Sequence, residues 1–244
     1  MGRTSPAAPV NAGDPARRAH YLDALGIDTW VSRRVPVQGG EQAPARDSAP
    51  VRGGAADGDW QALRAEVAGC VKCRLCETRT QTVFGVGDPR ARWLIVGEAP
   101  GAEEDRRGEP FVGRAGQLLD AMLRAVGLTR ETVFIANVLK CRPPGNRDPR
   151  PDEVASCLPY LVRQLALIEP DIILAVGRIA AQTLIGTDAP VARLRGRVHT
   201  YGAALTPLIV TYHPAYLLRS PGEKRKAWDD LKLARETARG HRTG

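Results

Sequence analysis

The sequence predicts an α/β protein with a doubly wound, mostly parallel four-stranded sheet flanked by helices. Short apolar runs with the length of buried strands alternate along the chain with longer segments that have one apolar face, as helices do. Pro151 marks the start of one such helix and Gly186 the end of another. The length of 244 residues is ordinary for one α/β domain with an appendage.

The first predicted elements form a strand–helix–strand unit. Residues 93–97 predict a buried strand, and residues 133–139 predict a second one. The segment 115–126 between them predicts a helix, because its apolar residues lie on one side: Leu118, Leu119, Met122, Leu123 and Val126. A unit of this kind pairs its two strands in parallel.

The rest of the chain repeats this alternation. The sequence predicts, in order, a helix at 151–168, a strand at 171–176, a helix at 178–185, a strand at 208–211 and a charged helix at 224–239. In a sheet of this type, functional side chains are expected at the carboxyl ends of the strands.

The N-terminal part differs from the rest in composition. Residues 1–58 are rich in Pro, Gly, Ala and Arg, and they have no periodic apolar face. We predict a largely disordered extension there and one folded domain at 59–240. Residues 20–34 interrupt the extension with a short apolar segment around Tyr21, Leu25 and Trp30. Two interpretations stay open: this segment folds back on the domain, or it docks on another protein.

Charge and apolar content exclude some classes of protein. The 35 Lys and Arg residues outnumber the 27 Asp and Glu residues, and the net charge of +8 favours a polyanionic partner. No apolar stretch approaches the roughly 20 residues of a membrane helix, and the N-terminus has no secretory signal. We therefore expect a cytoplasmic protein with no membrane partner, and a monomer, because the sequence shows no obvious apolar interface.

Chemically capable side chains stand at three predicted strand ends. Glu98 follows the first strand, Asn137 ends the second and His213 follows the fourth, while Phe111 lies in the loop after the first strand. That loop is long and acidic, so it does not match the Gly-x-Gly-x-x-Gly dinucleotide fingerprint. Each residue alone has a structural explanation, such as a cap, a turn or a core position. Their coincidence at one sheet edge predicts a ligand pocket.

Four of the five cysteines have the spacing of a metal site. Cys70 and Cys73 form a Cys-x-x-Cys pair, and Cys141 and Cys157 follow later in the chain. Four thiolates hold either tetrahedral zinc or a [4Fe–4S] cluster, and the spacing alone does not choose between them. Cys76 forms a second Cys-x-x-Cys pair with Cys73.

Four segments together resemble the family 4 uracil-DNA glycosylases, the iron–sulfur branch of their superfamily. These segments are Gly-Glu-Ala-Pro-Gly at 97–101, Pro-Phe-Val-Gly-Arg-Ala-Gly at 110–116, Lys-Cys-Arg-Pro-Pro at 140–144 and His-Pro-Ala-Tyr-Leu-Leu at 213–218. The resemblance spans about residues 60–235, in order. It implies a uracil-DNA glycosylase-like fold and an enzyme of base excision repair, which flips deoxyuridine out of DNA and hydrolyses its N-glycosidic bond.

The resemblance also implies the cofactor and the uracil pocket. Cys70, Cys73, Cys141 and Cys157 match the ligands of a [4Fe–4S] cluster with a structural role, and Cys76 is left over. Gly97, Gly101, Phe111 and Asn137 match the uracil pocket: the Phe111 ring stacks on the base, and the Asn137 amide accepts from N3–H and donates to O4. His213 matches the histidine that donates a hydrogen bond to uracil O2 as a neutral imidazole.

The catalytic carboxylate is less directly implied. In family 1 enzymes an Asp follows the residue that matches Glu98, whereas this sequence has Ala99. Glu98 and Glu104 are therefore the candidates for orienting water or stabilising the cationic sugar, with Glu98 first. Gly101 stands where family 1 has an aromatic residue that rejects thymine, and we expect Glu104 to fill that space.

DNA contacts are expected from five basic residues and one leucine. Leu217 is predicted to enter the gap left by the flipped base, beside Tyr216 and Leu218. The basic residues are predicted to contact phosphates: Arg114, Lys140, Arg142, Arg147 and Arg219.

The sequence also suggests one protein partner and leaves two alternative functions to consider. Residues 20–34 weakly resemble the N-terminal peptide of the psi subunit of the bacterial clamp loader, which implies a tether to a replication clamp-loader component. An iron–sulfur DNA-binding module without turnover is one alternative, and the joint presence of Glu98, Phe111, Asn137 and His213 argues against it. A relative that captures uracil covalently is another, but the segment 141–150 lacks the nucleophilic histidine that this would require.

Overall fold

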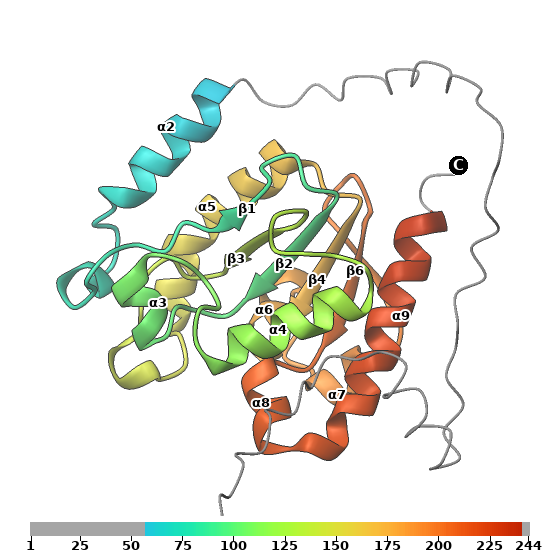
Figure 1. Ribbon diagram of the computed structural model, residues 1–244. Coiled ribbons are helices and arrows are strands. Elements are labelled where there is room, and N and C mark those ends of the chain that lie inside the picture. The colour runs from blue at the N-terminus through green and yellow to red at the C-terminus, as the bar shows by residue number, and fades with distance from the viewer. Residues whose placement is uncertain (1–56, 241–244) are drawn as a thin grey trace, which may run out of the picture. The chain divides into compact units, whose positions relative to one another are not determined.

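The computed structural model describes residues 57–240, and this part of the chain contains one six-stranded sheet in the order β1-β3-β2-β4-β6-β5 (Figure 1). The four central strands are parallel: β3 (Phe134–Asn137), β2 (Trp93–Gly97), β4 (Ile172–Val176) and β6 (Thr206–Thr211). The predicted α/β class and the mostly parallel sheet are confirmed.

The predicted number of strands was wrong, because two antiparallel edge strands were missed. These are β1 (Val86–Gly87), which pairs with β3, and β5 (Val198–Tyr201), which pairs with β6. Strand β1 has only two residues, and β5 is partly exposed along its whole length. Neither contains the apolar run that identifies a buried strand in a sequence.

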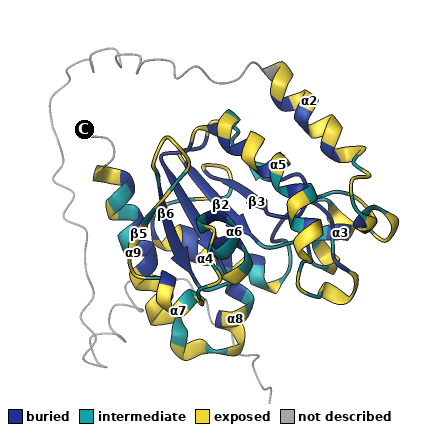
Figure 2. Ribbon diagram, turned by 180° about the vertical axis from the view of Figure 1, so that it is seen from behind, coloured by how far each residue is buried: buried dark blue, intermediate teal, exposed yellow. Residues whose placement is uncertain are grey.

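Helices cover both faces of the sheet (Figures 1 and 2). The α-helices are α2 (Asp57–Ala68), α3 (Ala102–Arg107), α4 (Arg114–Ala125), α5 (Pro151–Ile168), α6 (Arg178–Ile185), α7 (Val191–Leu194), α8 (Pro214–Arg219) and α9 (Lys224–Gly240). Short 3-10 helices are η1 (Arg74–Glu77), η2 (Pro144–Asn146) and η3 (Pro221–Glu223). The four predicted helices agree with α4, α5, α6 and α9 to within one residue at each end.

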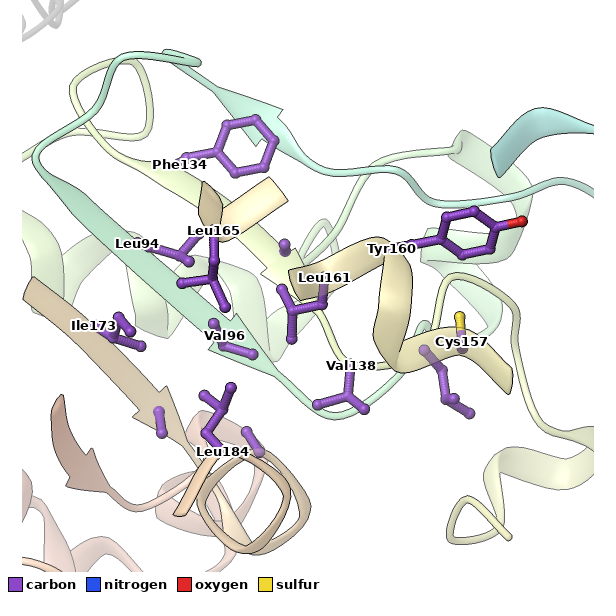
Figure 3. Packing of buried hydrophobic residues seen from close by; sticks show 14 of the residues in the cluster. Leu94, Val96, Phe134, Val138, Cys157, Tyr160, Leu161, Leu165, Ile173 and Leu184 are labelled. Carbon is purple, nitrogen blue, oxygen red and sulfur yellow. The ribbon is translucent and has the colours of Figure 1, made fainter. Parts of the chain in front are cut away.

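The core lies in two layers, one on each face of the sheet. Along β2, Leu94 and Val96 point to the layer formed with α2, α5 and α6, while Trp93 and Ile95 point to the layer formed with α4 and α9. Figure 3 shows the first layer, in which Leu161 of α5 packs near the central strands. The strands are apolar on both faces because both faces are covered.

The sheet topology brings the functional segments together. The carboxyl ends of β3, β2, β4 and β6 are neighbours, so the loops that follow them meet at one edge of the sheet. The predicted extension at 1–58 lies almost entirely outside the described residues, and its segment 20–34 lies wholly outside them. Among the helices of residues 57–240, none has both the length and the apolar character of a membrane span.

Candidate active site

The side chains of Asn137 and Phe111 converge over Gly97 at the end of β2. A Cβ atom at Gly97 would lie 2.3 Å from Asn137 Oδ1 and 2.7 Å from Phe111 Cζ, so only glycine leaves room for both. Asn137 is 2% exposed, and its Oδ1 atom is buried without a hydrogen-bond partner among the described residues. A buried acceptor of this kind is costly unless a ligand satisfies it.

Phe111 has an unusual backbone conformation. Its φ angle is 55°, in the left-handed region that bulky side chains rarely adopt. Its carbonyl oxygen occupies the space beside Gly116, where a Cβ atom would lie only 1.7 Å from it. Phe111 is only 6% exposed. The packing around its ring therefore holds the residue in this unfavourable backbone conformation.

His213 directly precedes α8 and is the N-cap residue of this helix. Its ring stacks on Phe111 with a centroid separation of 5.5 Å and an interplanar angle of 28°. Its Nδ1 atom accepts a hydrogen bond from the backbone N–H of Ala215 at 3.1 Å, which leaves the proton of the neutral ring on Nε2. Burial lowers the pKa of His213 to about 4, with a smaller effect from Arg219 that Glu104 opposes. The imidazole is therefore neutral near pH 7 and keeps an Nε2–H donor.

Glu98 follows directly after β2. Its backbone carbonyl accepts from Leu139 N–H at 3.0 Å, which extends the pairing of β2 with the chain after β3. Burial raises the pKa of its carboxyl group, Asp148 raises it further, and Arg178 acts in the opposite direction. Burial thus makes the charged form of this carboxyl group less favourable than in water.

Glu104 is committed to the backbone of two neighbouring segments. Its Oε2 accepts from Gly101 N–H at 3.1 Å, and its Oε1 accepts from Val112 N–H at 3.0 Å and Gly113 N–H at 3.3 Å. The carboxylate therefore joins the start of α3 to the loop that carries Phe111. The Gly101 N–H, which belongs to a residue predicted for the uracil pocket, is bound to the Glu104 carboxylate and so is not directed at a ligand.

One of the predicted phosphate contacts, that of Lys140, is wrong. Lys140 is 1% exposed, and its Nζ donates to Asn137 O at 2.9 Å and to Gln164 Oε1 at 2.6 Å. A side chain buried in this way cannot reach DNA. Arg147 donates to the buried Glu153 carboxylate at 2.9 Å and so holds its loop to α5. The Lys140 side chain is drawn inward by Gln164, which is distant in sequence, whereas Arg147 pairs with the nearby Glu153 and its side chain stays 33% exposed.

Other predicted DNA contacts have the necessary exposure. Arg114, the first residue of α4, and Arg219, the last of α8, are exposed. Arg142 is half-buried, and its Nε donates to Asn146 Oδ1 at 2.8 Å. All three follow strand ends on the pocket side of the fold.

The prediction that Leu217 enters the DNA stack was also wrong. Leu217 is 1% exposed and belongs to the apolar layer beneath α4 and α9. Its neighbours Tyr216 and Leu218 are 37% and 36% exposed. Successive residues of a helix point in different directions, so the inward position at 217 leaves 216 and 218 on the surface.

The four predicted cysteine ligands line one cavity. Cys70 and Cys73 come from the segment after α2, Cys141 from the chain after β3 and Cys157 from α5, and Cys76 does not line this cavity. Arg79 Nη1 lies 3.1 Å from Cys141 Sγ, and the backbone N–H of Lys140 donates to Cys157 Sγ at 3.2 Å. Within residues 57–240, no three Cys, His, Asp or Glu side chains are grouped to hold a single metal ion.

Comparisons with known proteins identify the family of this chain. A model of the uracil DNA glycosylase superfamily matches residues 84–232. A type-4 uracil-DNA glycosylase of Archaeoglobus fulgidus is 47% identical over 174 residues, which cover 68% of this chain and 87% of that protein. The chain belongs to the type-4 uracil-DNA glycosylases.

Further relatives lie in the same family. A type-4 uracil-DNA glycosylase of Sulfurisphaera tokodaii is 43% identical over 183 residues, covering 72% of this chain and 83% of the relative. One of Pyrobaculum aerophilum is 42% identical over 181 residues, covering 72% of this chain and 92% of the relative. The family predicted from the four sequence segments is confirmed.

Sequence reasoning missed several residues that support the pocket of this type-4 glycosylase. Gly177 follows β4 with a φ angle of 99°, and a Cβ atom there would lie 3.0 Å from His213 Cβ. A glycine between a predicted strand and a predicted helix is a signal that could have identified it. Arg130, which binds the backbone carbonyl of Phe111, had no such signal, because it is a charged residue in an ordinary loop.

Proposed function

We propose that this chain hydrolyses the N-glycosidic bond of deoxyuridine in DNA, which releases uracil and leaves an abasic site for base excision repair. The observation that carries the proposal is the buried Oδ1 of Asn137, which lies beside the Phe111 ring and has no hydrogen-bond partner within residues 57–240. The target base has to leave the helix stack before it can enter such a pocket.

Base identity is read by Asn137. Uracil presents an N3–H donor and an O4 acceptor, and an asparagine amide can pair with both. Cytosine presents the opposite pattern, an N3 acceptor and an N4 donor, so it would leave the buried Oδ1 of Asn137 facing another acceptor. The Phe111 ring, buried beside Gly97, offers an apolar face for the base.

His213 stabilises the leaving uracil. Cleavage of the bond develops negative charge on uracil O2, and a donor placed there lowers the barrier. Nδ1 of His213 already accepts from Ala215, so Nε2–H is the donor that is left for O2. Because its pKa is about 4, the ring acts as a neutral donor and not as a cation.

Glu98 is the carboxylate that assists water or the cationic sugar. It follows Gly97 directly at the end of β2, whereas the two oxygens of Glu104 are bound to three backbone N–H groups. We therefore assign Glu104 to holding the loop that carries Phe111. In this position it also fixes the chain at Gly101, where rejection of thymine is expected.

DNA is bound around the pocket by exposed side chains. Arg114, Arg142 and Arg219 are suited to phosphate contacts, which add affinity without sequence preference and weaken with salt. Tyr216 and Leu218 are exposed large hydrophobic residues of α8, the helix that His213 precedes. They replace Leu217 as the side chains that fill the gap left by the flipped nucleotide.

A [4Fe–4S] cluster held by Cys70, Cys73, Cys141 and Cys157 completes the proposal. Four thiols around one cavity can hold such a cluster, and membership of the type-4 family favours it over a single zinc ion. The Arg79 guanidinium beside Cys141 also fits an anionic group there. When bound, the cluster supplies a rigid link between α2, α5 and the chain after β3.

The proposal is tested with labelled oligonucleotides that contain one uracil, thymine or cytosine, followed by alkaline cleavage of abasic sites. The expected result is cleavage only at uracil, with several uracils released per protein molecule. Asn137→Ala is expected to lower the excision rate at least about 100-fold, because it removes the reading contact. Cleavage at all three bases, or release that stops after one uracil per chain, would contradict the proposal.

A further inference from the structure

Arg130 makes an unusual set of contacts on the outer side of the loop that carries Phe111. Its Nη2 donates to Pro110 O at 2.6 Å, and its Nη1 donates to Phe111 O at 3.1 Å and to Asp120 Oδ1 at 3.0 Å. The guanidinium thus binds two successive backbone carbonyls and one carboxylate of α4. The Arg130 and Asp120 side chains are only 20% and 27% exposed, so solvent competes weakly for these contacts.

The loop needs such a brace because Phe111 is strained. A bulky residue at a φ angle of 55° is held in this unfavourable conformation only by its surroundings. Gly116 provides the space for the Phe111 carbonyl, and the Arg130 fork binds that carbonyl. Without the fork, a peptide rotation at Phe111 would relieve the strain and move the ring.

The position of the Phe111 ring matters because the ring contacts the residues of the proposed uracil pocket. The Phe111 ring packs over Gly97, beside Asn137, and stacks on His213. It therefore adjoins both the residue proposed to read uracil and the residue proposed to assist its release. Glu104 binds the backbone N–H groups of Val112 and Gly113 on the next residues of the same loop. Arg130 and Glu104 therefore hold the loop from its carbonyl side and from its N–H side.

We propose that Arg130, supported by Asp120, is a positioning residue that fixes the Phe111 ring in the orientation needed to stack on uracil. Arg130 contacts neither the base nor the reacting atoms and acts only through Phe111. This inference rests on the stacking role proposed for Phe111.

The test is a double-mutant cycle of Arg130→Met and Phe111→Ala in the full chain. The readouts are kcat/KM for uracil excision, inhibition by free uracil and binding to DNA with an abasic-site analogue. Arg130→Met is expected to lower kcat/KM about 10- to 100-fold and to weaken inhibition by free uracil similarly, because a small displacement of a binding group has such effects. Binding to the abasic analogue should stay unchanged, since the Arg130 guanidinium is occupied by Pro110, Phe111 and Asp120 and is not among the proposed DNA contacts.

The cycle separates positioning from a general effect on folding. If Arg130 acts through Phe111, the Arg130→Met change has little further effect in the Phe111→Ala background. Arg130→Lys is expected to restore only part of the activity, because an ammonium cannot bind two carbonyls and a carboxylate as a planar fork does. Asp120→Asn should cause a smaller loss in the same direction, and it serves as the test if Arg130→Met does not fold.

The matched control is Arg92→Met. Arg92 also pairs with an aspartate, Asp171, and donates to a backbone carbonyl, that of Ala238, but it precedes β2 at the opposite end of the sheet. An equal loss of uracil inhibition in this control, or additive effects in the cycle, would overturn the proposal. If Phe111→Ala alone leaves uracil inhibition unchanged, the stacking role fails instead.

Discussion

At the scale of single residues, burial adjusts two titratable groups in opposite directions. It lowers the pKa of His213 to about 4 and raises the pKa of Glu98, because in each case the neutral form is easier to bury. A neutral imidazole still donates a hydrogen bond, whereas a protonated carboxyl group no longer stabilises a cationic sugar. Acid should therefore stop the reaction through Glu98 and not through His213.

The first prediction concerns the pH dependence of excision. The single-turnover rate is expected to fall as pH decreases through the raised pKa of Glu98, while His213 is still neutral. The measurement is the excision rate at saturating enzyme from about pH 4 to about pH 9. Glu98→Gln should be slower and should lose this acid limb. An acid limb that persists in Glu98→Gln would assign it to another group.

At the scale of elements, α8 shows how one short helix serves both the core and the surface. Its first residue follows His213, whose side chain caps it through Ala215 N–H. Leu217 faces the core layer with α4 and α9, while Tyr216 and Leu218 face solvent. The packing of Leu217 therefore anchors the helix that carries His213, and the exposed pair is left for DNA.

The second prediction separates these two roles on α8. Leu217→Ala is expected to lower the free energy of unfolding by about 2–5 kcal/mol, because it leaves a cavity in the core. Leu218→Ala should change stability by less than about 0.5 kcal/mol but should slow excision from double-stranded DNA. Denaturant unfolding and excision assays on both variants test this. A stable Leu217→Ala protein with a selective loss on double-stranded DNA would restore Leu217 as the inserting residue.

At the scale of the whole molecule, the cysteine cavity joins parts of the fold that are far apart in sequence. Its thiols come from the segment after α2, from the chain after β3 and from α5. The same region is tied to α3, because the backbone N–H of Thr80 donates to Asp105 at 2.9 Å. A cluster bound here would stabilise the folded protein as a crosslink does, since the unfolded chain has no such site.

The third prediction uses two matched cysteine variants. Cys157→Ser should lose iron, sulfide and the brown colour, whereas Cys76→Ser should retain them, because Cys76 does not line the cavity. If the cluster contributes about 2 kcal/mol, the melting temperature of Cys157→Ser should fall by about 4–8 °C. Metal analysis and thermal unfolding under anaerobic conditions provide the measurements. Zinc in place of iron and sulfide in the unchanged protein would contradict the cluster.

Much of the fold could be predicted from the sequence because its signals are local. Apolar runs identified the four central strands, and the spacing of apolar residues identified α4, α5, α6 and α9. The resemblance to the family selected, from the five cysteines, the four that line one cavity in the structure. The edge strands were missed, because a strand with one exposed side or two residues lacks the pattern of burial.

The sequence by itself determined the fold class, the family and the residue types that stand at the strand ends. Only the tertiary structure decided which of these side chains reach the pocket. Lys140 and Leu217 turn inward because residues distant in sequence bind the one and bury the other, and Glu104 is held by backbone N–H groups of its own loop. The role of Arg130 also follows only from the tertiary structure, because the sequence does not show that its guanidinium contacts the carbonyl of Phe111.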